Sequence, residues 1–75
     1  MGISLLTLQN GVVAIIKQIT LQKEAVKRLM LAGLQQGKVV KVVQKHSNGS
    51  VTLEVNDTKV VVGRDLAHCV FVNHI

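Results

Sequence analysis

Three histidines and one cysteine are the side chains of this sequence that could bind a transition metal: His46, His68, His74 and Cys69. Imidazole nitrogen and thiolate sulfur are ligands that zinc and iron accept. His68 and His74 lie six residues apart on one predicted strand, so their Cα atoms would be roughly 20 Å apart at ~3.3 Å per residue. Ligands lie about 2 Å from a shared ion, so these two histidines cannot form one site within a chain. A site that joins His46 to Cys69, or one that bridges two chains, stays open, but we assign no metal ligand and no cofactor.

The carboxylates offer no acid–base pair. They lie on different predicted elements, without a spacing that would place a general acid opposite a general base. A cysteine nucleophile with a histidine base is the other option, but neighbours on a strand point to opposite faces, so Cys69 cannot meet His68 there. The sequence therefore predicts that the chain is not an enzyme. The four carboxylates are Glu24, Glu54, Asp57 and Asp65.

A short glycine-containing segment, residues 33–39, has some likeness to a phosphate-binding loop. It is one residue shorter than that motif, lacks the Ser or Thr after Lys38, and follows a predicted helix where the motif follows a strand. The end of the helix and a turn explain both Gly33 and Gly37. We therefore assign no nucleotide to this segment.

Composition indicates a small domain with an aliphatic core. The 75 residues predict a single domain over residues 1–75, and 48% of them are hydrophobic, which is enough for a core without disulfides. Phe71 is the one aromatic residue. Because single-strand-binding barrels stack bases on aromatic side chains, we predict no nucleic-acid partner. The net charge of +5 keeps a basic nucleic-acid-binding barrel as an alternative, which a steep salt dependence of affinity would reveal.

Nothing in the sequence predicts secretion or membrane insertion. A single cysteine, Cys69, allows no intramolecular disulfide, as is usual in a reducing compartment. The first residues lack the basic segment of a signal peptide. The longest apolar run, residues 12–16, is far shorter than the ~20 residues that span a bilayer. We therefore expect a cytoplasmic protein that is peripheral to the membrane at most, with scattered cations that favour an acidic partner surface.

One helix is predicted among the elements that must position these residues, over residues 22–32. Good helix formers fill it, and its apolar residues follow the i, i+3, i+4, i+7 spacing of a helix that packs on a core. Gly33 suits the left-handed residue that ends a helix, and Leu34 suits the hydrophobic residue that packs back on the last turn. Thr20 is the candidate cap at the other end. The predicted core-facing stripe is Val26, Leu29, Met30 and Gly33.

Five short segments have the β-branched residues or the period-two alternation of strands. Tight turns separate them, most clearly Asn48-Gly49 and Asn56-Asp57, and residues 63–67 predict a short turn of helix. Short strands joined by tight turns curl into a barrel, which removes exposed edges. The sequence therefore predicts a mainly β fold, a small SH3-like barrel of about five strands with one inserted α-helix. The predicted strands are 12–19, 38–45, 50–55, 58–62 and 68–74.

The segment from Lys27 to Val42, KRLMLAGLQQGKVVKV, resembles the signature of the ferrous iron transport protein A (FeoA) family. That signature is an Arg-Leu, a hydrophobic pair before Gly-Leu, two residues ending in Gly, and then a strand rich in Val and Ile. The resemblance extends over nearly the whole chain. The sequence departs from the family at Gln36, where proline is usual, and at Gly63, where a larger residue is frequent. Matching positions outside the segment include Leu5, Leu8, Gly11, Val13, Ile15, Ala67, Val70 and Val72.

The resemblance implies an SH3-like barrel in the bacterial cytoplasm that assists the FeoB ferrous iron permease, a membrane protein with a cytosolic GTPase domain. Family members are thought to bind that partner and modulate uptake, and a GTPase-activating role has been proposed for them; Arg28 could serve it only by pointing away from the core. Family-like residues concentrate in the helix and the loop after it, so we expect the partner surface there. A transition-metal-binding or metal-sensing barrel is the alternative, and self-association into a homo-oligomer stays open. The predicted contact residues are Lys27, Arg28, Leu31, Leu34 and Gln35.

Overall fold

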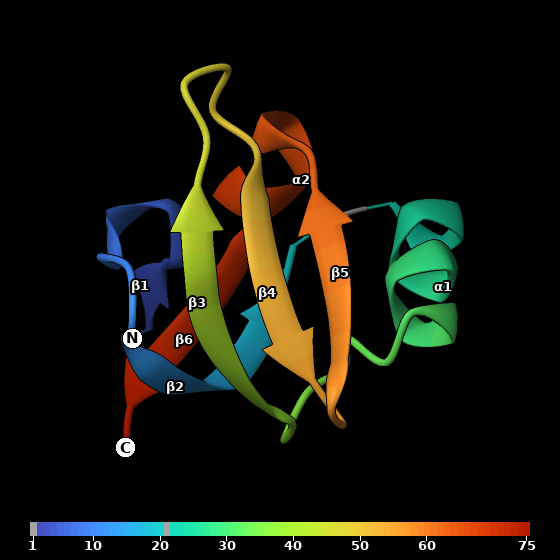
Figure 1. Cartoon of the computed structure of the whole chain (residues 1–75). Helices are drawn as coiled ribbons and strands as arrows, with labels where there is room; N and C mark the ends of the chain where they lie inside the picture. The colour runs from blue at the N-terminus through green and yellow to red at the C-terminus, as the bar shows by residue number, and fades with distance from the viewer. Residues whose placement is uncertain (1, 21) are drawn as a thin grey trace.

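The computed structural model describes residues 2–20 and 22–75, whose strands form one six-stranded antiparallel sheet. The strands are adjacent in the order β1-β6-β2-β3-β4-β5, and Figure 1 shows the sheet curling on itself with α1 outside it. The prediction of a mainly β, SH3-like barrel with an inserted helix is confirmed. The strands are β1 (Ile3–Ser4), β2 (Val13–Ile19), β3 (Val39–Lys45), β4 (Val51–Val55), β5 (Thr58–Val62) and β6 (Val70–His74), and the helices are the 3-10 helix η1 (Leu5–Thr7), α1 (Lys23–Leu31) and α2 (Arg64–His68).

Two irregularities bend the long strands. The register of β2 against β6 shifts between Ile16 and Gln18, and that of β3 against β4 shifts between Val42 and Gln44. Each shift leaves one extra residue on the bulged strand, which increases its bend and twist. Strand β2 therefore pairs with β3 along its first half and with β6 along most of its length.

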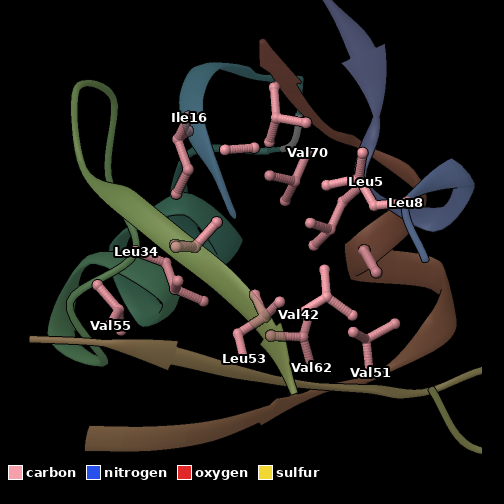
Figure 2. Packing of buried hydrophobic residues seen from close by; sticks show 14 of the residues in the cluster. Leu5, Leu8, Ile16, Leu34, Val42, Val51, Leu53, Val55, Val62 and Val70 are labelled. Carbon is pink, nitrogen blue, oxygen red and sulfur yellow. The ribbon is translucent and has the colours of Figure 1, made fainter. Parts of the chain in front are cut away.

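The core is built from alternate residues of the strands. In β4, Val51, Leu53 and Val55 are at most 2% exposed, while Thr52 and Glu54 between them are only half-buried, as the alternation of the sequence predicts. Figure 2 shows these side chains converging with those of the other strands on one interior. The remaining buried residues are Leu5, Leu8, Ala14, Ile16, Leu29, Leu34, Val40, Val42, Val62, Ala67, Val70 and Val72.

Helix α1 ends as the sequence predicts. Gly33 has φ +92°, its N–H donates to the carbonyl of Met30 at 2.9 Å, and the N–H of Leu34 donates to the carbonyl of Leu29 at 2.8 Å. These two bonds define a Schellman motif, in which a hydrophobic residue after the glycine packs on the last turn. Leu29 and Leu34 both belong to the core. The motif therefore fixes the direction in which the chain leaves the helix.

The start of α1 differs from the prediction. Gln22 is the N-cap and makes no side-chain capping bond. Thr20 does not cap the helix, because its N–H and hydroxyl both donate to the carbonyl of Cys69, at 2.9 and 3.3 Å. Thr20 therefore continues the attachment of β2 to the start of β6. Within residues 2–20 and 22–75 no helix is long and apolar enough to cross a lipid bilayer.

Both ends of the chain depart from the predicted strands. Ile3 and Ser4 form a sixth strand, β1, opposite Val72 and Phe71 of β6; two residues are too few to show an alternation. Helix α2 extends to His68, so the predicted strand 68–74 begins at Val70 instead. His68 and Cys69 thus do not lie on a strand, and the prediction that they face opposite sides of one is wrong.

The two predicted hairpin turns have different geometries. Asn56 and Asp57 both have positive φ, 53° and 62°, and lie between the paired residues Val55 and Thr58, which defines a type I′ turn. In the Asn48-Gly49 loop only Gly49 has positive φ, and its N–H donates to the carbonyl of His46 at 3.0 Å. That loop is the three-residue type with a G1 bulge.

Replacing Asp57 by glycine should stabilise the protein. Left-handed backbone is unfavourable for residues with a Cβ, and Asn-Gly is the preferred type I′ pair. We expect the free energy of unfolding to rise by about 0.5–1 kcal/mol, the gain being limited by the greater freedom of glycine in the unfolded chain. Urea denaturation of the variant and the parent measures this change. A lower stability for Asp57→Gly would contradict the turn assignment.

Candidate partner-binding surface

Helix α1 presents most of its surface to solvent. Of its nine residues only Leu29 is buried, while Ala25 and Val26 are half-buried. In Figure 1 the helix stands outside the curved sheet, on the side of the view where β5 lies. Met30, which the sequence predicted on the core-facing stripe, is 47% exposed. That part of the prediction is wrong, because the helix packs on the barrel through a narrower stripe centred on Leu29.

Four of the five predicted contact residues have side chains that solvent reaches. Lys27 and Arg28 are exposed, Gln35 is half-buried, and Leu31 is 90% exposed. Leu34, in contrast, is 1% exposed, and Figure 2 shows its side chain pointing into the interior near that of Val55. Leu34 therefore cannot contribute its side chain to a surface, and it is corrected to a core residue that holds the end of α1.

Leu31 lies between two cations on the helix surface. Residues three and four apart on a helix are neighbours, so Arg28 and Lys27, at i−3 and i−4, both flank Leu31. An apolar side chain this exposed at the end of a helix gains nothing for the fold. The end of α1 thus presents an apolar tip with a positive charge on either side. We call Lys27, Arg28 and Leu31 the helix tip.

A shallow groove runs beside the helix tip. Its volume is about 260 Å³, and its walls come from α1, from the end of β2 and from the loop after α1. Sequence reasoning missed this groove because the helical spacing assigned Val26 and Met30 to the core. The spacing does not show whether a residue at the edge of the apolar stripe is covered by the barrel or open to solvent. The lining residues are Ile19, Val26, Met30, Gln35 and Gln36.

Backbone hydrogen bonds hold the loop side of this groove. The N–H of Lys38 donates to the carbonyl of Gln35 at 3.1 Å, and Gly37 has φ +90° while Gln36 does not have positive φ. This is a type II turn, in which proline is common at the second position. The departure of Gln36 from the family pattern therefore leaves the turn type unchanged. Ile16 anchors the turn from β2, through bonds of 2.8 Å to Gly37 and to Lys38.

The predicted metal-binding candidates do not assemble into a site. Among residues 2–20 and 22–75, no group of three His, Cys, Asp or Glu side chains is arranged to hold a metal ion. The Nε2 atom of His46 lies 2.7 Å from the hydroxyl of Thr52 on the neighbouring strand. Cys69 is a half-buried free thiol. Within the described part of the chain, neither His46 nor Cys69 thus belongs to a group of three such side chains.

Solved structures share this fold. A crystal structure of an iron uptake regulatory protein, FeoA, has a TM-score of 0.88 and 24% identity over 100% of this chain and 99% of that chain. The solution structure of FeoA from Chlorobium tepidum has a TM-score of 0.89 and 23% identity over 97% of this chain and 70% of that chain. A manganese-dependent transcriptional repressor has a TM-score of 0.91 and 13% identity over 99% of this chain, which spans 42% of the repressor. At these identities the likeness establishes the fold.

The family follows from the sequence match. No curated protein matches the chain. The model of the FeoA domain matches residues 3–74, a range that includes all the described strands and helices. The segment that carries the resemblance supplies the Schellman end of α1, the type II turn and the start of β3. The chain belongs to the FeoA family, and membership implies a part in ferrous iron transport.

Proposed function

We propose that this chain is a cytoplasmic accessory protein of bacterial ferrous iron uptake that binds the cytosolic GTPase domain of a FeoB-type permease. The contact is made by the helix tip and by Gln35. The observation that carries the proposal is the exposure of Leu31, which is 90% accessible between Lys27 and Arg28. Family membership indicates the transport process, and an exposed leucine flanked by two cations supports binding as the mode of action.

The chemistry of the helix tip favours a protein partner. A single leucine side chain that moves from water into a protein interface contributes about 1.5–3 kcal/mol. The two flanking cations would orient the chain on an acidic surface and speed the encounter with it. Their contribution to affinity is smaller. A partner that presents an apolar depression rimmed by carboxylates would satisfy both parts of this surface. The net charge of +5 on the chain also favours a partner with a negatively charged surface.

The core supports this surface indirectly. Leu34 and Leu29 anchor the end of α1 in the barrel, and the Schellman bonds join the last turn of the helix to the chain that follows it. The surface is therefore built before the partner arrives, which lowers the conformational entropy lost on binding. Leu34 thus acts on the partner only through the placement of the helix tip.

Replacing Leu31 by glutamine should weaken binding to the cytosolic GTPase domain by at least about tenfold, because the apolar contribution of the side chain is lost. The measurement is an affinity determination, by calorimetry or pull-down, with the GTPase domain from the same organism in the presence and absence of GTP. Val61→Gln is the matched control, since Val61 is also an exposed aliphatic residue, at 67%, but lies on β5. Both variants should keep the unfolding midpoint of the parent. Equal affinity of Leu31→Gln and the parent would remove the helix tip from the contact.

A further inference from the structure

The groove beside α1 has an apolar floor and two polar rims. Ile19, Val26 and Met30 provide the apolar surface, and the amides of Gln35 and Gln36 lie across from the helix. Met30 is 47% exposed, which is unusual for a residue on the same face as a packed stripe. Its unbranched thioether side chain can adapt to the shape of what it contacts. The groove therefore has a deformable wall on the helix and a wall fixed by the type II turn.

Two exposed lysines of α1 are neighbours of the groove-lining residues. Lys23 and Lys27 precede Val26 and Met30 by three positions, so each lysine is a neighbour of one lining residue. Both lysines are exposed. Arg28 follows Val26 by two positions, about 200° around the helix, and so lies on the other side. The rim next to the groove thus carries two positive charges that belong to α1.

The volume of the groove favours one or two side chains of a partner over a small-molecule ligand. About 260 Å³ is below the roughly 300–1,000 Å³ that is usual for small-molecule sites. A partner's apolar group that covers the side chains of Ile19, Val26 and Met30 removes their apolar surface from water, which favours binding. One or two aliphatic side chains of a partner fit these dimensions. The lysine rim then requires that carboxylates stand beside them.

We infer that this groove receives an aliphatic or aromatic side chain carried on an acidic segment of the partner, with the carboxylates of that segment facing Lys23 and Lys27. The inference rests on the proposed function and adds a second contact to it, since the groove contains Ile19, Val26 and Met30, none of which belongs to the helix tip. The helix tip inserts into the partner, and the partner inserts into the groove. Such reciprocal insertion fixes the orientation of the two proteins.

A second copy of this chain fits the groove poorly. In a two-fold symmetric contact the same surface patch lies on both sides, so a contact centred on the groove would bring Lys23 and Lys27 of one chain near the same lysines of the other. Like charges brought together disfavour such a contact. The acidic segment is therefore the occupant that the charges of the groove select.

The test is the affinity of the Met30→Gln variant for the cytosolic GTPase domain of the permease from the same organism. Glutamine keeps the helix propensity and length of methionine but puts an amide where the apolar contact would form. We expect affinity to fall by about thirtyfold, the size of an interface hot spot, and Met30→Leu to keep the affinity of the parent. Lys23→Gln, at the rim lysine that lies outside the helix tip, should weaken binding at low salt and flatten its salt dependence.

The outcomes separate the groove from the helix tip. If the parent binds and Met30→Gln binds equally well, while Leu31→Gln does not, the groove inference is wrong and the proposed function stands. If the parent does not bind the GTPase domain at all, both fail. A loss of self-association in Met30→Gln, seen by sedimentation of the chain alone, with unchanged affinity for the GTPase domain, would make a second copy the occupant and overturn the acidic segment.

Discussion

Leu34→Ala is expected to lower the free energy of unfolding by about 2–5 kcal/mol, the range for a leucine truncated in a core. Leu34 is 1% exposed and is the residue whose N–H closes the Schellman motif on Leu29. Its loss leaves a cavity between α1 and the barrel. A 75-residue protein has a stability of roughly 4–11 kcal/mol at 0.05–0.15 kcal/mol per residue. The substitution would therefore remove a large share of the total.

The control for Leu34 lies three residues earlier. Leu31→Ala removes the same atoms from a side chain that is 90% exposed, so we expect a change within about 0.5 kcal/mol. Urea denaturation followed by far-ultraviolet circular dichroism suits both variants, because the chain has no tryptophan or tyrosine. Equal losses from Leu31→Ala and Leu34→Ala would contradict the division between core and surface on which the partner-binding proposal depends.

Gly33→Ala is expected to have the second largest effect, a loss of about 2 kcal/mol or more. A residue with a Cβ pays about 1–2 kcal/mol in the left-handed conformation, and Gly33 has φ +92°. A Cβ at this position would also stand 3.2 Å from Nδ2 of Asn56 and 3.6 Å from a methyl group of Val55. The Asn56 side chain would have to move by a few tenths of an ångström to make room, whereas the distance to Val55 is that of an ordinary contact.

Gly37→Ala separates the two causes. Gly37 has φ +90°, and a Cβ there would meet nothing within 4 Å. Its substitution therefore carries the backbone penalty alone, about 1–2 kcal/mol. The difference between the two variants measures how closely the helix end packs on the β4–β5 turn. A loss for Gly33→Ala no greater than that for Gly37→Ala would mean that this contact contributes nothing.

The features that local rules determine could be predicted from the sequence. Gly33 and Leu34 identified the end of α1, because a glycine followed by a hydrophobic residue after a helical segment is the pattern of a Schellman motif. The alternation in residues 51–55 identified the buried face of β4, because alternate residues of a strand point to opposite faces of the sheet. The inserted helix and the barrel followed from these segments in order.

The features that depend on distant partners could not be predicted. Strand β1 exists through pairing with β6 at the other end of the chain. Thr20 resembles a helix cap by sequence, but its hydroxyl donates a hydrogen bond to the carbonyl of Cys69. His68 has no local signal that separates a last helical residue from a first strand residue. In each case a contact across the fold decided between two local options.

The candidate site divides in the same way. The helical period placed Lys27 and Arg28 away from the core, and both are exposed. It could not place Met30, since a residue on the edge of a stripe is buried only if the barrel extends beneath it. Leu34 was assigned to the contact surface because it belongs to the family-like segment, although its role in the helix end already explained it.

The most direct measurement follows backbone amide signals of the 15N-labelled chain while the unlabelled cytosolic GTPase domain of the permease is added, with GTP and without it. We expect shifts or broadening in α1, in residues 35–36 and at Ile19, with little change in the β3–β4 hairpin and in α2. Changes concentrated on the hairpin and α2, or no change at saturating partner, would contradict the claim that α1 and its groove form the partner-binding surface.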